Sequence, residues 1–146
     1  MSVAAMEDAV LIDAATALYA LSPSDPRSAS CQAKLLDLAS GKSRGYISTE
    51  MVQEVVFHRM RRTQNRAQSI EEGRGLIRSF TVLKFDDEVL DTSLNLIEQL
   101  PNVRGRDAVH AATALIYGIP KILSPDKDFD QIPGVTRIDP LASQDS

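Results

Sequence analysis

Residues 104–130, RGRDAVHAATALIYGIPKILSPDKDFD, join an alanine-rich helix pattern to a short apolar strand pattern. Gly118 and Pro120 separate the two patterns, which is the residue chemistry expected where a helix stops. Acidic side chains usually lie on solvated faces of elements, so their position at element ends needs a separate explanation. One aspartate stands at the start of the helix pattern and three follow the strand pattern; they are Asp107, Asp126, Asp128 and Asp130.

The same alternation of short apolar runs and helix patterns extends outward over most of the chain. Strands that alternate with helices favour a parallel sheet covered on both faces. The predicted fold is therefore α/β, a central, mostly parallel, twisted sheet of about five strands with helices on both faces. We expect strands at 9–12, 45–48, 81–85, 121–123 and 135–138. We expect helices at 28–40, 49–60, 66–80, from Asp86 or Asp87 to about 100, and 106–117, with a brief one after Asp13. The 28–40 helix is expected to turn Cys31, Leu35, Leu36 and Leu38 toward the core.

Length and composition are those of an ordinary globular chain. Of 146 residues, 43% are hydrophobic and 25% charged, so we expect one domain over residues 1–141 and a polar tail over residues 142–146. The longest apolar stretch is interrupted by Asp13 and is too short to span a bilayer. The single cysteine, Cys31, rules out an internal disulfide and fits a reducing cytoplasm. A net charge of −4 argues against coating nucleic acid through bulk charge but leaves room for a local basic patch.

Four acidic residues are expected to meet at one edge of this sheet. Ligands of open parallel sheets bind outside the carboxyl ends of the strands. Asp13 follows the first strand directly, and Asp126 lies three residues after the strand at 121–123. Asp107 opens its helix from the same side of the sheet. Glu54, which lies in the helix after the second strand, can lean over the same edge.

Converging carboxylates repel one another, and a buried one is costly unless a cation neutralises it. Oxygen ligands without histidine or cysteine favour Mg²⁺ or Mn²⁺ over Zn²⁺. Such an ion makes its bound water more acidic and screens a leaving oxygen, which suggests hydrolysis of a phosphodiester. Taken singly, each residue also has a structural explanation, such as Asp107 as a helix-start residue favoured by the dipole. Taken together, the four favour a site.

Four stretches cover nearly the whole chain in a definite order: VLIDAATALYA, ISTEMVQEV, RGRDAVHAATALIYGIPKIL and SPDKDFDQIPGVTRIDP. In this order they resemble the PIN domain, and more closely the VapC-type toxin ribonucleases of type II toxin–antitoxin systems. The most specific part is RDAVHAATAL followed by S-x-D-x-D-F. The resemblance implies a three-layer PIN-like fold, an endoribonuclease that depends on Mg²⁺ or Mn²⁺, a cognate VapB-type antitoxin that neutralises it, and a homodimer.

The resemblance also implies the site residues. Asp128 competes with Asp126 for the last acidic position because both belong to the same short motif. The chain departs from the family after its first aspartate, where Ala14 and Ala15 stand in place of a small hydroxyl residue and Asn or Ser, with Thr16 as the first hydroxyl. This departure puts hydrogen bonding to the metal ligands in doubt. By resemblance the catalytic and metal-binding residues are Asp13 and Asp107 as direct ligands, with Glu54 and Asp126 as further ligands or orienters of the attacking water.

A basic segment, HRMRRTQNR at residues 58–66, stands out in an acidic chain. Local positive charge supplies most of the affinity for RNA, although the segment also fits antitoxin contact or a solvated helix end. His110, one turn after Asp107, is more typical of a packed histidine bonded to backbone than of a proton-transfer group. The residues expected to contact RNA are Arg59, Arg61, Arg62 and Arg106.

Two other functions remain open from the sequence. A catalytically weak or inactive PIN-like module that binds RNA or protein is favoured only by Ala14 and Ala15. A phosphotransfer receiver or an aspartate-nucleophile phosphatase usually has two aspartates around the first strand and a lysine at a late strand end, whereas Lys121 stands at the beginning of its strand. The primary hypothesis is therefore the metal-dependent ribonuclease.

Overall fold

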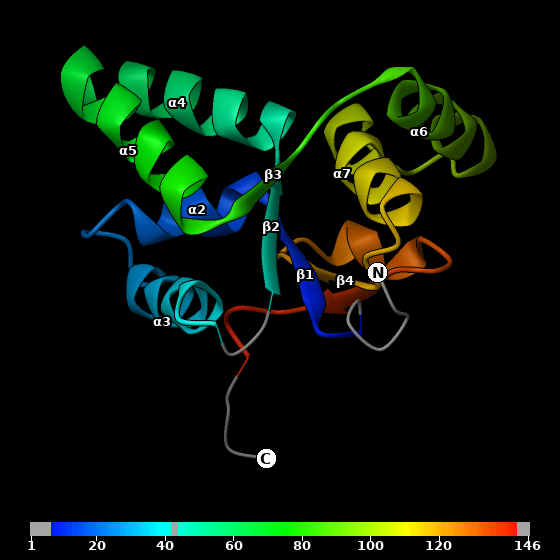
Figure 1. The fold of residues 1–146 in the computed structure, drawn as a ribbon, viewed down its shortest axis with the longest axis horizontal. Coiled ribbons are helices and arrows are strands. Elements are labelled where there is room, and N and C mark those ends of the chain that lie inside the picture. The colour runs from blue at the N-terminus through cyan, green and yellow to red at the C-terminus, as the bar shows by residue number, and fades with distance from the viewer. Residues whose placement is uncertain (1–6, 42–43, 143–146) are drawn as a thin grey trace.

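Five strands form one sheet in the structure, a computed structural model that describes residues 7–41 and 44–142 (Figure 1). Their order across the sheet is β3-β2-β1-β4-β5, and all four pairings are parallel. The predicted α/β fold is confirmed, and each strand lies within two residues of its expected bounds. The strands are β1 (Ala9–Ile12), β2 (Arg44–Ser48), β3 (Thr81–Leu83), β4 (Lys121–Leu123) and β5 (Thr136–Ile138).

Helices cover both faces of the sheet and make a three-layer domain. Figure 1 shows α6 and α7 on one side of the strands, with α2, α3, α4 and α5 on the other. The helices are α2 (Ala14–Ala20), α3 (Ser28–Ala39), α4 (Thr49–Thr63), α5 (Arg66–Ser79), α6 (Asp87–Gln99) and α7 (Gly105–Ile116), and the short 3₁₀ helix η1 (Lys127–Gln131) follows β4.

Strand β1 shows why both faces need a helical layer. All four of its residues are buried. Ala9 and Leu11 pack in the core cluster that includes α6 and α7, whereas Val10 and Ile12 pack in the cluster that includes α2 and α4. An uninterrupted apolar strand of this kind is the pattern of a parallel sheet buried on both faces.

Helix α3 buries a narrower stripe than the sequence predicted. Cys31 is fully buried, and Leu35 and Leu38 pack against the core. The prediction for Leu36 is wrong, because its side chain is 70% exposed. Successive residues of a helix are rotated by about 100°, which carries Leu36 off the face that the other three residues share.

The close packing of α5 against α4 explains a glycine that is unfavourable for a helix interior. A Cβ atom placed on Gly73 would lie 2.5 Å from Cγ2 of Val56 on α4. A residue without a Cβ is therefore required at this contact. Gly75, two residues later, has no such constraint, because the only atom near its added Cβ is Arg78 Nη2 at 3.8 Å.

The strand order reverses between β1 and β4, and this reversal positions the site. The chain leaves β1 toward β2 on one side and later returns to β4 on the other. Ile12 is in register with Leu123, so the carboxyl ends of the two strands are adjacent. The backbone N–H of Asp13 extends the pairing by donating to the Leu123 carbonyl at 3.1 Å. Ligands of open parallel sheets bind at such a reversal.

Two predictions concern regions outside this core. Among residues 7–41 and 44–142, no helix has the length and apolar character needed to cross a bilayer. The predicted polar tail falls largely on residues 143–146, which lie outside the described residues. The division into a domain at 1–141 and a tail therefore stays a prediction.

Candidate active site

Asp13 leaves the end of β1 with its side chain turned toward β4. It occupies the N-cap position of α2, yet its side chain makes no capping hydrogen bond. Instead its Oδ2 accepts a hydrogen bond of 2.7 Å from Ser124 Oγ, which follows β4. Only 6% of Asp13 is exposed. Burial raises the pKa of this carboxyl group and the charge of Glu54 adds to the rise, while His110 and the Ser124 hydrogen bond oppose it.

Ser124 was not singled out by the sequence, although it stands in the S-x-D-x-D-F motif. Its Oγ donates to Asp13 and also accepts from the backbone N–H of Asp126 at 3.0 Å. Thr16 Oγ1 donates to the Leu123 carbonyl at 3.1 Å, which fastens the start of α2 to the end of β4. Although Ala14 and Ala15 offer no hydroxyl group, Asp13 does accept a hydrogen bond from one, that of Ser124 in the segment after β4.

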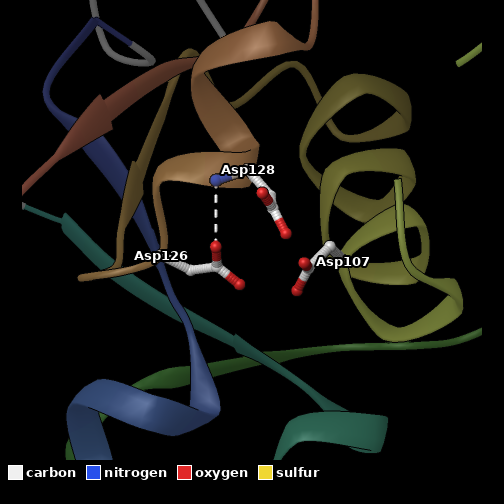
Figure 2. Close-up of side chains that lie close together, drawn as sticks. All are labelled: Asp107, Asp126 and Asp128. Atoms are coloured by element: carbon white, nitrogen blue, oxygen red, sulfur yellow. Dashed lines mark hydrogen bonds between the residues drawn. The ribbon is translucent and has the colours of Figure 1, made fainter. Parts of the chain in front are cut away.

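Figure 2 shows three further carboxyl groups that lie close together, those of Asp107, Asp126 and Asp128. Asp107, from the first turn of α7, faces Asp126 and Asp128 at the start of η1, and one oxygen from each lies within 4.8 Å of the others. Asp126 Oδ1 accepts from the backbone N–H of Asp128 at 2.9 Å, the dashed line in Figure 2. The structure therefore groups Asp128 with Asp126, so the two need not compete for one position.

The carboxyl group of Asp107 is buried beside other carboxyl groups. Asp107 is 7% exposed, and its buried Oδ2 has no hydrogen-bond partner within the described part of the chain. Burial, together with the neighbouring charges of Asp126 and Asp13, raises the pKa of Asp107 to about 7. An unpartnered buried oxygen among like charges fits a bound cation, and an all-oxygen donor set fits a hard ion such as Mg²⁺ or Mn²⁺.

His110, one turn along α7 from Asp107, lies between two of the predicted site residues. Its Nε2 is 3.5 Å from Asp13 Oδ1 and 3.7 Å from Glu54 Oε1. Its buried Nδ1 has no hydrogen-bond partner among residues 7–41 and 44–142, so the expected hydrogen bond to backbone is not made by that atom. Burial alone would lower the pKa of His110, but Glu54, Asp13 and Asp107 together raise it.

Glu54 reaches the site from α4, as expected, but at a different point from the three aspartates. Arg106 Nη1 lies 3.3 Å from Glu54 Oε2, in a pair whose arginine side chain is 74% exposed. Although burial favours a higher value, His110 and Arg106 bring the pKa of Glu54 below its usual range, so the carboxylate is ionised. Glu54 is therefore placed beside His110 rather than within the aspartate cluster.

The four arginines predicted to contact RNA have different environments. Arg59 is 5% exposed, and its Nε and Nη2 donate to the two carboxylate oxygens of Glu72 at 2.9 and 3.1 Å. The RNA contact predicted for Arg59 stays a prediction, and its burial in an ion pair that joins α4 to α5 argues against it. Arg61 and Arg62, on the same helix, are exposed, as is Arg106.

A cavity of about 850 Å³ connects the acidic residues with exposed cations. Asp13, Glu54, Asp107 and Asp126 all line it, together with Arg62 and Arg106. Arg61 lines a smaller neighbouring groove instead. An anionic polymer can therefore approach an acidic centre only if a cation there neutralises the carboxylates, while the arginines at the rim attract its phosphates.

Comparison with known proteins places the chain in a family. The PIN domain model matches residues 10–135. Ribonuclease VapC13 of Mycobacterium tuberculosis is 25% identical over 137 residues, covering 88% of this chain and 98% of that protein. The solved structure of VapBC2 from Rickettsia felis, bound to a DNA fragment from its promoter, has a TM-score of 0.72 at 14% identity, over 89% of this chain and 97% of its own.

A second solved structure has the same fold. VapC20 of Mycobacterium tuberculosis, a toxin that cleaves the sarcin–ricin loop, has a TM-score of 0.70 at 16% identity, covering 83% of this chain and 92% of its own. The family model matches most of the length of this chain, including the acidic cluster at the reversal between β1 and β4. The chain belongs to the PIN domain family.

Proposed function

We propose that this protein is a metal-dependent endoribonuclease of the VapC toxin type, which hydrolyses phosphodiester bonds of RNA. The observation that carries the proposal is Asp107, whose carboxyl group lies beside Asp126 and Asp128 and whose buried Oδ2 has no hydrogen-bond partner among the described residues. Family membership and the likeness to ribonuclease VapC13 support RNA as the substrate class.

The roles of the residues follow from their surroundings. Asp107, Asp126 and Asp128 would hold Mg²⁺ or Mn²⁺, with Asp13 beside them as a further ligand held in orientation by its serine partner. The bound ion would supply an acidified water molecule and positive charge at the scissile phosphate. Glu54, ionised and 3.7 Å from His110 Nε2, would act as an orienter or proton acceptor for the attacking water.

The exposed arginines at the rim would hold the substrate. Arg62 and Arg106 line the cavity, and Arg61 lines the adjoining groove. Contacts of this kind position an RNA backbone without reading its sequence. Arg106 is also paired with Glu54, so substrate binding and the orientation of Glu54 are coupled through one side chain.

A toxin of this type requires a partner that keeps it inactive. VapBC2 from Rickettsia felis was solved as a VapBC assembly on promoter DNA. By analogy we propose that a cognate VapB-type antitoxin covers the acidic edge, that the toxin forms a homodimer, and that it acts in the cytoplasm. Co-purification with the product of a neighbouring gene tests the antitoxin, and light scattering of the purified chain tests the homodimer. A monomer that binds no such product contradicts both proposals.

Cleavage of a panel of structured and single-stranded RNAs tests the activity. The chain is assayed with Mg²⁺, with Mn²⁺ and with chelator, beside Asp13→Ala and Asp107→Asn. Asp91→Asn, a remote and exposed position on α6, is the matched control. We expect metal-dependent cutting that both site variants abolish and the control retains. A folded protein that cuts no RNA under any condition, or cutting that survives both site substitutions, contradicts the proposal.

A further inference from the structure

The end of the cavity away from the acidic centre contains an ordered stack of side chains. The guanidinium carbon of Arg27 lies 3.7 Å from the centre of the Tyr19 ring. Asp25 holds Arg27 from the edge, because its two oxygens accept from Arg27 Nε at 2.9 Å and Nη2 at 2.7 Å. All three residues line the same cavity as Asp13 and Asp107.

This arrangement fixes the plane of Arg27 while leaving part of it accessible. The side chain of Arg27 is 44% exposed, and that of Asp25 is 19% exposed. Arg27 lowers the pKa of Asp25 to about 2, so the pair is ionised at any pH at which RNA is studied. The Tyr19 ring lies against one face of the guanidinium group and the Asp25 carboxylate along one edge, while 44% of the Arg27 side chain stays exposed.

A structural role explains only part of these contacts. Asp25 Oδ1 also accepts from the backbone N–H of Arg27 at 2.8 Å, which fixes the turn before α3. That bond does not require the Arg27 side chain to lie over Tyr19 within the cavity. The stack is therefore a separate feature, and its chemistry is that of a platform for a flat ligand. Unpaired nucleobases stack on arginine planes and aromatic rings in proteins that bind single-stranded RNA.

The distance to the acidic centre matches a short length of RNA. Tyr19 lies six positions after Asp13 along α2, a rise of about 9 Å along the helix axis. A stacked single strand covers this distance in about three nucleotides at roughly 3.4 Å each, and an extended strand needs fewer. Figure 1 shows α2 running away from the end of β1 under α4, with the following loop at the edge of the domain. Arg62 of α4 lines this part of the cavity and lies near enough to Asp25 to influence its pKa.

We infer that Arg27, stacked on Tyr19, forms a base-stacking subsite for single-stranded RNA, within about three nucleotides of the phosphate that is cut. Arg62 contacts a phosphate of the same segment. This inference rests on the proposed ribonuclease function and adds a requirement to it: the segment beside the cleavage site is unpaired when bound.

Binding of two fluorescent single-stranded RNAs tests the subsite. One is a short oligonucleotide of mixed sequence, and the other has the same sugar–phosphate backbone with abasic sites in place of bases. Affinity is measured by anisotropy with Mg²⁺ in an Asp107→Asn background, which prevents cutting. Arg27→Ala removes the stack and the charge, whereas Arg27→Lys retains the charge alone. Arg78→Ala is the matched control, because Arg78 also forms an exposed pair with a carboxylate, Glu71, but lies outside the cavity.

Base stacking predicts a specific pattern of results. Arg27→Lys is expected to weaken binding of the normal RNA about 5- to 100-fold, the range for loss of one stacked base, and to leave binding of the abasic RNA unchanged. Arg27→Ala, which also removes a positive charge, is expected to weaken binding of the normal RNA more than that of the abasic RNA. The control leaves both unchanged. Equal weakening for both RNAs, or rescue by lysine, overturns stacking in favour of a phosphate contact. No weakening in either variant overturns the subsite. Thermal unfolding of each variant identifies any loss that comes from misfolding.

Cleavage assays separate this inference from the proposed function. In the background with Asp107 intact, Arg27→Ala should lower kcat/KM for the same RNA mainly through KM. If the unsubstituted chain cuts RNA but Arg27→Ala cuts equally well at low substrate concentration, the subsite is wrong and the ribonuclease stands. If the unsubstituted chain cuts no RNA, the proposed function itself fails. Loss of antitoxin binding without loss of RNA binding would assign the stack to the protein partner and overturn the inference.

Discussion

Ser124 Oγ donates a hydrogen bond of 2.7 Å to Asp13 Oδ2, joining the ends of two adjacent strands across 111 residues of sequence. The same oxygen accepts from the backbone N–H of Asp126 at 3.0 Å. One buried hydroxyl group therefore fixes both the orientation of Asp13 and the backbone position from which Asp126 projects. Groups that orient metal ligands commonly matter nearly as much as the ligands themselves.

Replacing this serine should impair activity while preserving the fold. Ser124→Ala leaves Asp13 free to rotate and is expected to reduce metal-dependent cleavage about 10- to 100-fold. Ser93→Ala is the control, since Ser93 is also buried and bonded through its hydroxyl group, to the Leu90 carbonyl, but lies on α6. Cleavage rates and thermal unfolding are measured together. Full activity in Ser124→Ala would show that Asp13 needs no such support.

Metal binding should release a proton below neutral pH. Because the pKa of metal-free Asp107 is about 7, an ion that binds at about pH 6 must displace the proton from most molecules, whereas at about pH 8 the carboxylate is already ionised. Affinity is therefore expected to weaken as pH falls below about 7, by up to about tenfold per pH unit. Calorimetric titration with Mg²⁺ or Mn²⁺ in buffers of different ionisation enthalpy counts the protons. Release that persists in Asp107→Asn would assign the proton to another group, such as His110.

The raised pKa of Asp107 should also affect the stability of the metal-free protein. A carboxyl group with a pKa of about 7 when folded, against 3.8 ordinarily, stabilises the fold fully below about pH 4, and this contribution is lost as pH rises through about 7. Asp107→Asn removes the dependence. At about pH 8 we expect this variant to have a free energy of unfolding greater by on the order of 1–3 kcal/mol, with little difference at about pH 4. Urea unfolding in the presence of chelator measures the free energy of unfolding of both proteins at each pH. A difference between them that does not change with pH would contradict the raised pKa of Asp107.

Arg59 should contribute to stability and not to RNA binding. Arg59 is buried but Glu72 is only partly buried and keeps a hydrogen bond from Gln68, so Arg59→Ala is expected to lower the free energy of unfolding by about 1–3 kcal/mol. Arg61→Ala, an exposed position on the same helix, should change stability by less than about 0.5 kcal/mol. Below its unfolding temperature Arg59→Ala should still bind RNA normally. Weaker RNA binding with unchanged stability would restore the role that the sequence suggested.

Two glycines of α5 should respond to alanine in opposite directions. Gly73→Ala places a Cβ 2.5 Å from Val56 Cγ2 and should destabilise the protein by about 1–3 kcal/mol. Gly75→Ala meets no close atom and should stabilise the helix by up to about 1 kcal/mol. Denaturant unfolding of the two variants gives the comparison. Equal effects would mean that α4 and α5 separate easily.

Much of the architecture was determined by the sequence itself. The alternation of apolar strands with helices, and stop signals such as Gly118 and Pro120, are local patterns that depend on residues a few positions apart. Strand bounds were therefore predicted to within two residues, and the capping of α6 by Asp86 was predicted as one of two choices. The positions of Asp13 and Asp126 after parallel strands were sufficient to place both at one edge of the sheet.

Tertiary structure alone decided how residues distant in sequence combine. Arg59, Arg61 and Arg62 lie in one basic segment, and only the packing of α5 on α4 determines that the first is buried against Glu72. The bond between Ser124 and Asp13 depends on β4 pairing with β1, which no local pattern specifies. The physical reason is the same in both cases: local pattern determines whether a segment is helix or strand, whereas the partner of a polar side chain depends on which surfaces the folded chain brings together and removes from water.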